Sequence, residues 1–230
     1  MSTTSGTYNF SPSLGELVLY AYYLIGVRST ALTQQHMEVA RMAANIVCAD
    51  FSNKGVNLWQ VQFITVPLVQ GQATYSVNAN TVTMLDAYIS TTTGTSTVDR
   101  IIMPISRTEY ASYPNKAQQG YPTVFWNDRL LSPTVTLWPV PDGTQTSLNY
   151  YSIVQLQDAV LTDGQAPDIP YLWLKAFVYA LATEFAFIWE IDRVAVLTPI
   201  AGAAYEAAAT TNVETSQFFI SPMISSYFRS

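Results

Sequence analysis

Apolar residues recur at helical spacing in the first part of the chain. A short helix is predicted from Ser13 to about Ile25, because Ser13 suits an N-cap and Gly26 ends the apolar run. A second helix is predicted from Thr33 to Gly55. Its apolar residues are three or four positions apart, the spacing of one packed helix face: Met37, Ala40, Ala44, Val47 and Phe51.

The pattern changes to short strands between Leu58 and Ile153. β-Branched, partly alternating segments are separated by Gly, Pro and Asp turns, which predicts six or seven strands in a small β-sandwich or barrel. Residues 91–97, rich in Thr, Ser and Gly, are interpreted as an exposed loop. Segments 122–127 and 134–138 are predicted to pair as a hairpin.

Helical spacing returns after Asp168, which suits a helix start together with Pro170. From Tyr171 to about Glu190 apolar residues fall on every face, so this helix is predicted to be buried on all sides. Another helix is predicted between Arg193 and about Thr211, with Pro199 either kinking it or opening it after a Thr198 cap.

These elements predict an α+β fold, in which N- and C-terminal helices form a bundle and an antiparallel β-domain is inserted between them. The expected divisions are a flexible arm over residues 1–12, the bundle over 13–56 and 168–212, the β-domain over 57–167, and an extended C-terminal arm over 213–230.

The C-terminal arm is too apolar for a solvated tail and too irregular for an amphipathic helix. It is therefore interpreted as a segment that docks on another molecule, with folding back on its own subunit as the alternative. The apolar residues expected to make this contact are Phe218, Phe219, Ile220, Met223, Ile224, Tyr227 and Phe228.

Charge is scarce along the whole chain. Only 11% of residues are charged, against roughly 25% in an average soluble domain, so much of the exterior is expected to be covered. A membrane is not the expected cover, because Lys175 and Glu184 would fall on opposite faces of the only segment long enough to span it. Contacts with other subunits are the favoured explanation.

The charge balance also limits the contact with nucleic acid. The net charge is −6 and the ten basic residues are scattered singly, which argues against a protein that wraps DNA. The single Cys48 excludes an intrachain disulfide and fits assembly in a reducing cytoplasm.

Few residues are available for catalysis. His36 is the only histidine, and no Gly-rich phosphate loop or G-x-S-x-G sequence is present, so no enzyme, cofactor or metal is expected. Asp142, Asp163 and Asp168 suit turns or a helix start. Glu184 lies on an apolar helix and is expected to pair with Arg or Lys across a subunit boundary. The alternative is a carbohydrate-active β-domain, in which a carboxylate pair acts beside a sugar platform of Trp126 and Trp138.

Five short motifs follow one another along the chain: Gly71-Gln72-Ala73-Thr74-Tyr75, Pro104-Ile105-Ser106-Arg107-Thr108-Glu109-Tyr110, Gly120-Tyr121-Pro122, Thr136-Leu137-Trp138-Pro139-Val140-Pro141 and Asp168-Ile169-Pro170. Their succession resembles the head-to-tail adaptors of short-tailed bacteriophages, of the packaged-DNA-stabilisation and tail-tubular-protein-A type. The resemblance is concentrated between Ile101 and Pro141 and extends in order and spacing over most of residues 14–212.

The resemblance implies a structural virion protein at the head–tail junction, assembled in the host cytoplasm. It implies a ring of about twelve copies under the portal protein, with tail nozzle or tail fibre proteins below and DNA passing through without sequence-specific binding. Another tail or head-completion protein is the alternative within the virion. Since a ring needs two different contact surfaces per subunit, the candidates are Met37, Val47, Phe51, Trp173, Phe177 and Glu184.

Overall fold

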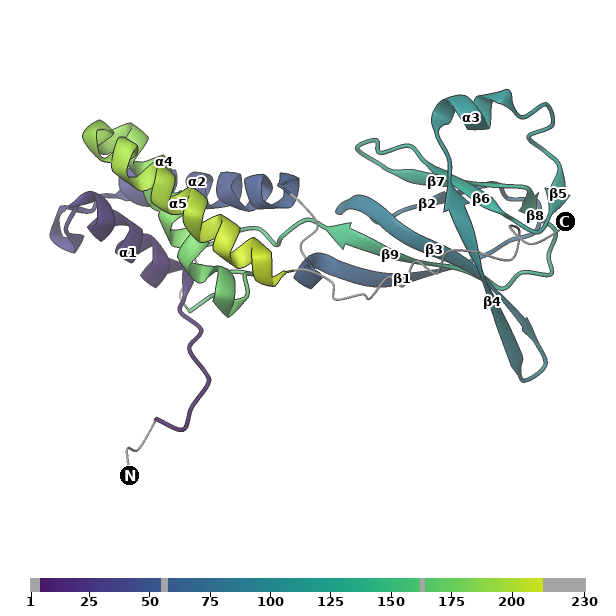
Figure 1. Ribbon diagram of the computed structural model, residues 1–230, viewed down its shortest axis with the longest axis horizontal. Helices are drawn as coiled ribbons and strands as arrows, with labels where there is room; N and C mark the ends of the chain where they lie inside the picture. Colours follow the sequence, from purple (N-terminus) through teal and green to yellow (C-terminus); the bar gives the residue numbers. More distant parts are fainter. Residues whose placement is uncertain (1–4, 55–57, 162–163, 213–230) are drawn as a thin grey trace, which may run out of the picture.

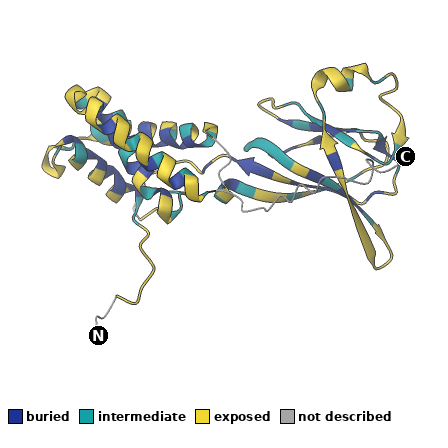
Figure 2. Cartoon of the chain, viewed as in Figure 1, coloured by how far each residue is buried: buried dark blue, intermediate teal, exposed yellow. Residues whose placement is uncertain are grey.

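Helices gather at one end of an elongated molecule and strands at the other (Figure 1). The computed structural model of the chain describes residues 5–54, 58–161 and 164–212. Buried residues form one core among the helices and a second core within the sheet, and Figure 2 shows both, with exposed residues around them. The fold is therefore α+β, as predicted from the sequence.

Four long helices make up the helical end: α1 (Leu14–Ile25), α2 (Gln34–Asn53), α4 (Leu174–Trp189) and α5 (Ile191–Thr211). The predicted start and end of α1 are confirmed. Ser13 and Glu16 form a capping box, in which the Ser13 amide donates to the Glu16 carboxylate at 2.8 Å. Gly26 ends α1 in the left-handed conformation, with φ of 93°.

Helix α4 is the centre of the helical end, because α1, α2 and α5 all pack against it. Tyr22 of α1 stacks on Phe185 of α4 with 4.2 Å between ring centroids. Phe51 of α2 contacts Trp173, which lies in the short 3-10 helix η3 (Tyr171–Trp173) before α4, at 5.7 Å. These aromatic contacts explain why both sequence ends are needed to build this core.

Seven strands form one curled sheet in the order β1-β9-β3-β4-β6-β7-β2, and a pair, β5-β8, lies beside it. Their bounds are β1 (Val61–Pro67), β2 (Thr74–Ser76), β3 (Thr81–Thr93), β4 (Ser96–Pro104), β5 (Gln119–Gly120), β6 (Val124–Asn127), β7 (Thr134–Trp138), β8 (Val140–Pro141) and β9 (Ser147–Val154). The β6–β7 hairpin was predicted. The sheet is not wholly antiparallel, because β4 pairs with β6 and β5 with β8 in parallel.

The curl of the sheet encloses its core. Ile89 and Leu148, from β3 and β9, share one buried cluster with Phe125 and Leu137, from β6 and β7. The predicted helical turn after Pro104 is the short helix α3 (Arg107–Ser112), which lies over the outside of β6 and β7 through contacts described below.

One local prediction is wrong, and one of two alternatives is excluded. Residues 91–97 are not a loop, because β3 and β4 continue to Thr93 and from Ser96, and Gly94 makes the turn with φ of 63°. Threonine is β-branched and fits an extended strand, so its polarity was misleading. Of the two alternatives for Pro199, opening a helix after a Thr198 cap is excluded, because α5 begins at Ile191 and the Thr198 hydroxyl donates to the Val194 carbonyl within it.

The prediction that the helix after Pro170 is buried on all sides is wrong for a single subunit. Phe187 and Ile188, near the end of α4, are each more than half exposed. Its neighbours α1, α2 and α5 do not cover the whole circumference of α4 at that end. The apolar side chains left over lie on the surface of the helical end.

Candidate assembly surfaces

Four of the six predicted interface residues lie inside the subunit. Val47, Phe51, Trp173 and Phe177 are all buried in the helical core. Their side chains contact other elements of the same chain, so they are corrected from interface to core residues. Helical periodicity identifies an apolar face, but it does not show whether that face meets the same chain or another one.

Met37 and Glu184 remain accessible. Met37 is about one third exposed, at 36%. Glu184 is half-buried and lines a groove of about 590 Å³ between α2, α4 and α5. The groove also holds Glu206 and an ion pair of Lys54 with Asp50 at 2.5 Å. Among the residues that the structure describes, Glu184 has no ion-pair partner, so the groove keeps an unpaired negative charge.

A set of exposed apolar side chains lies on α4 and α5 and was not among the predicted site residues. We call it the α4–α5 surface; its members are Phe187, Ile188, Ile191, Val196 and Ile200. A second groove, of about 450 Å³, runs along α5 and is lined mainly by alanines with Leu172 and Pro199. Helix α5 is thus covered by its own subunit on one side only.

A row of polar side chains crosses four strands on the outer face of the sheet, away from its core. The Thr65 hydroxyl donates to the Asn149 side-chain carbonyl at 2.8 Å, and the Asn149 amide donates to the Ser90 hydroxyl at 2.7 Å. The Ser90 hydroxyl in turn donates to the Asp99 carboxylate at 2.6 Å. This row links β1, β9, β3 and β4, and it could be found only once the strand register was known.

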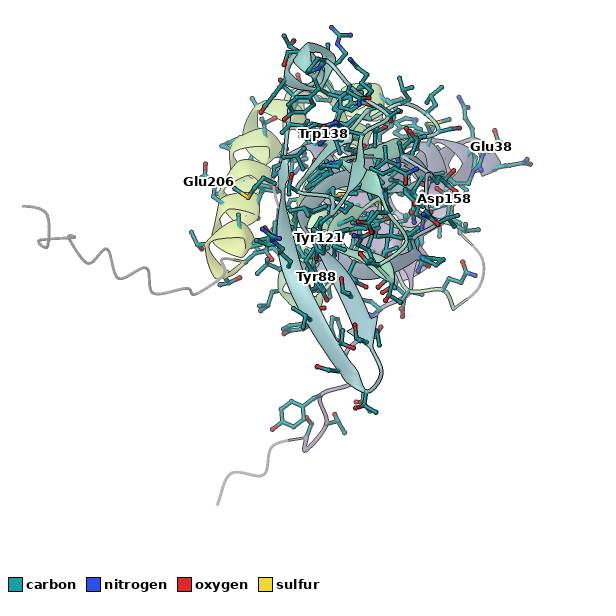
Figure 3. All side chains as sticks on the ribbon, turned by 90° about the vertical axis from the view of Figure 1, so that its right-hand side faces the viewer. Glu38, Tyr88, Tyr121, Trp138, Asp158 and Glu206 are labelled. Carbon is teal, nitrogen blue, oxygen red and sulfur yellow. The ribbon has the colours of Figure 1, made fainter. Side chains whose placement is uncertain are left out.

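An apolar row lies beside the polar row on the same face. Phe63 of β1 is paired with Tyr151 of β9, and their ring centroids are 5.1 Å apart. Tyr88 of β3 lies 6.3 Å from Phe63 and is paired with Ile101 of β4. Figure 3, viewed from the β end, labels Tyr88 beside the β3–β4 hairpin. Partial burial and the nearby Asp99 carboxylate raise the pKa of Tyr88, in agreement with this crowding.

The proposed sugar platform is covered by α3. Trp138 stacks on Tyr113 with 4.1 Å between ring centroids, and its indole N–H donates to the Asn115 carbonyl at 3.0 Å. Trp126 stacks on Tyr110 at 5.6 Å. Each indole therefore has one ring face occupied by a tyrosine of the same subunit, which argues against a flat aromatic surface for glycans.

The titratable residues have structural surroundings. Burial raises the pKa of Cys48 to about 11, with smaller effects from Asp168 and Asp158. His36 stacks on Trp189 at 4.6 Å, and its Nδ1 lies 2.7 Å from the Thr33 hydroxyl.

Two of the aspartates singled out from the sequence accept hydrogen bonds within the subunit. Hydrogen bonds from the Thr144 hydroxyl and amide lower the pKa of Asp142 within its turn. Asp168 accepts a bond from the Gln157 amide at 3.4 Å, and Asp163 lies outside the described residues. In the part of the chain that the structure describes, no three His, Cys, Asp or Glu side chains are grouped to hold a metal ion.

Within the described residues, one helical stretch, Tyr171–Trp189, has the length and composition to cross a membrane. Half of its most apolar window is buried inside the protein, where α1, α2 and α5 pack on it. This is the environment of a core helix. The arm residues from Phe218 to Phe228 that were predicted to dock elsewhere lie outside the described residues.

The exposed surfaces of the described residues are apolar or hydrogen-bonded faces and grooves, which suit a protein that makes contacts with other molecules. Comparison with known families agrees with this class. The chain belongs to the SU10 adaptor protein family, which matches residues 30–219, as the resemblance to phage head-to-tail adaptors predicted. Membership of an adaptor family also argues against an enzyme. No curated protein matches the sequence.

Proposed function

We propose that this chain is a phage head-to-tail adaptor that assembles as a ring under the portal protein. The ring joins the DNA-filled head to tail nozzle or fibre proteins and lines the channel through which DNA leaves. About twelve copies close the ring, each using two different surfaces, as cyclic head-to-tail assembly requires. The observation that carries the proposal is membership of the adaptor family over residues 30–219.

The exposed apolar side chains of the helical end support assembly. Phe187 and Ile191 on the α4–α5 surface are each more than half exposed. Exposed apolar side chains of this size are often covered by protein–protein contacts. Glu184 and Met37 lie elsewhere on the helical end and are proposed to meet the neighbouring subunit, with Glu184 pairing with a basic side chain of that neighbour.

The two ends of the molecule have separate roles in this proposal. The helices act as one domain, packing subunit to subunit around the channel, and residues 57–167 act as an inserted β-domain that faces the tail. The sparse basic residues suit a channel that DNA passes through without being held. Residues 213–230 form an arm that docks on the portal.

The arm is tested by replacing its apolar residues in the full chain. A variant with Phe218, Phe219, Ile220, Met223, Ile224, Tyr227 and Phe228 changed to serine is expected to fold but to lose portal binding. A matched control changes the serines Ser216, Ser221, Ser225 and Ser226 to alanine, which keeps every apolar residue. Binding is measured by co-sedimentation with portal rings. Unchanged binding of the first variant would contradict the arm assignment.

A further inference from the structure

Among the described residues, the outer side of β1 and part of one side of β4 have no neighbouring strand, and these free stretches lie on different sides of the sheet. Strand β1 is the first strand in the sheet order and pairs only with β9. Strand β4 pairs with β3 along its length but with β6 only at Met103 and Pro104. Within the described residues, the stretch from Ser96 to Ile102 therefore has no strand on its second side. Figure 2 shows this hairpin largely exposed.

The direction of the backbone groups at each edge follows from neighbouring hydrogen bonds. The Leu68 amide donates to Thr146 on the β9 side, so by alternation the amides of Val61, Phe63 and Thr65 point away from β9. The Met103 amide donates to Thr123 on the β6 side. By the same alternation, the amides of Thr97, Asp99 and Ile101 point away from β3, to the side on which β6 lies. They are beyond the end of β6 and therefore do not meet that strand. Each edge offers three amide donors with the carbonyls between them.

Most of the β1 edge lacks the features that usually protect an open edge, since the only proline of the strand, Pro67, stands at its end. From Val61 to Val66 the strand has no charge and no proline, and it is rich in β-branched residues. Soluble proteins normally block such edges with charges, prolines or bulges, because unpaired edges recruit other strands. On β4 the charged side chains do not block the edge: Asp99 accepts the Ser90 hydroxyl, and the Arg100 guanidinium lies 5.1 Å from the Tyr121 ring centroid.

We infer that the β1 edge of one copy pairs with the β4 edge of the next copy, so that the sheets join around the ring. This inference rests on the proposed function, since it names the contact that closes the ring. In the sheet β1 and β4 run in opposite directions. Repeating the sheet side by side therefore sets β4 of one copy antiparallel to β1 of the next, the arrangement of an ordinary antiparallel pair.

The apolar row on the outer face of the sheet favours a second copy of this chain as the partner of the β1 edge. The apolar row begins at Phe63 on β1 and ends at Ile101 on β4, where both side chains are half or more exposed. Joining the two edges brings Ile101 of one copy next to Phe63 of its neighbour. The row then continues from subunit to subunit and buries apolar area that each isolated copy leaves in water.

Proline substitutions remove a backbone amide from the edge. Valine substitutions at the same positions serve as controls, because they lose the same side-chain hydrogen bonds but keep the amide. Thr65→Pro and Thr97→Pro each remove one outward amide, whereas Thr65→Val and Thr97→Val lose the same hydroxyl contacts but keep the amide. Circular dichroism and thermal melting establish that each variant folds. Ring yield with portal protein is measured by sedimentation velocity and negative-stain microscopy, and the proline variants are expected to yield roughly tenfold fewer rings than the valine variants.

Three outcomes separate the possibilities. Folded proline variants that form rings as the valine variants do would overturn the edge pairing alone. Rings of normal yield that no longer bind tail proteins would assign the edge to a tail partner and overturn pairing between copies. If the unmodified chain forms no ring on the portal, the proposed function fails, and the inference fails with it.

Cysteine cross-linking provides a test that does not depend on the proline variants folding. Thr65→Cys is combined in turn with Thr97→Cys, Asp99→Cys and Ile101→Cys, all on the outer face of the sheet. The native Cys48 is buried and does not compete. Mild oxidation of assembled rings is expected to link neighbouring subunits covalently in at least one combination. If rings assembled from each of the three double variants show no cross-link between subunits, the pairing of β1 with β4 is contradicted.

Discussion

The side-chain amide of Asn149 donates a hydrogen bond to the Ser90 hydroxyl between β9 and β3, with 2.7 Å between nitrogen and oxygen. Both residues are buried, at 5% and 7% exposure. The Asn149 side chain also accepts from Thr65 and lies 3.2 Å from the Ser147 hydroxyl, to which it donates. One amide therefore connects the centre of the sheet to its β1 edge.

Removal of this amide is expected to weaken the sheet. Asn149→Ala should lower the free energy of unfolding by about 2–3 kcal/mol, because it removes the hydrogen bonds that this buried side chain makes with Thr65, Ser90 and Ser147. Thr92→Ala is a suitable control, since its hydroxyl contact with Thr97 is exposed; its effect should be within about 0.5 kcal/mol. Urea unfolding followed by tryptophan fluorescence measures both. Equal effects would show that the polar row contributes nothing specific.

The turn between β6 and β7 is expected to make the β end sensitive to acid. Burial alone would raise the pKa of Asp128, but hydrogen bonds from the Thr134 amide and hydroxyl and the Leu130 amide outweigh it and lower the pKa. A carboxylate with a lowered pKa stabilises the fold above its ordinary value of 3.8, and this contribution is lost as pH falls through the lower folded value.

The comparison of wild type with Asp128→Ala at two pH values measures this contribution. At pH 7 the variant should unfold at lower urea concentration, by about 1–2 kcal/mol. At pH 2.5 the difference between the two proteins should shrink, because the wild-type carboxyl then approaches its protonated state. A difference that stays the same at both pH values would mean that the Asp128 charge does not stabilise the turn.

Cys48 is expected to be unreactive in the folded protein. Burial raises its pKa to about 11, so the thiol stays protonated at pH 8, where ordinary thiol reagents need the thiolate. Ala49→Cys places a second thiol one position along α2, at an exposed site. Under native conditions Ellman's reagent should react with one thiol in the variant and none in wild type, and with Cys48 only in denaturant. Rapid reaction of wild type would contradict the packing of α2.

Substitutions of two phenylalanines of α4 are expected to affect folding and assembly differently. Phe177 is fully buried, whereas Phe187 is 56% exposed. Phe177→Ala is expected to cost about 3–5 kcal/mol of stability. Phe187→Ala should cost the monomer less than about 1 kcal/mol but reduce ring formation. Thermal melting and sedimentation velocity measure the two effects, and a ring yield unchanged by Phe187→Ala would remove the α4–α5 surface from the interface.

Local sequence signals predicted the helical end well. Ser13 and Gly26 bound α1 because capping depends on residues next to the helix ends. Apolar spacing also identified Phe51 and Phe177 as packed residues, but assigned them to the wrong partner, since burial in the same chain and burial against another chain select the same side chains.

The candidate surface on the sheet could not be predicted from the sequence. Thr65, Ser90, Asp99 and Asn149 are up to 84 positions apart in the chain, and only the strand register brings them into one row. The same holds for the open edges, because whether β1 or β4 has a neighbour depends on the order of strands in the sheet. Alternation within a strand gives the two faces, but it does not give the neighbouring strands.

Ring formation on the portal is the central requirement of the proposed adaptor function. The purified protein is mixed with purified portal rings, and the complex is examined by cryo-electron microscopy. The number of subunits in each ring is counted in the class averages. We predict a closed ring of about twelve copies seated on the portal, each copy contacting two others through different surfaces. Portal rings without bound chain, or with single copies that do not contact each other, would contradict the account.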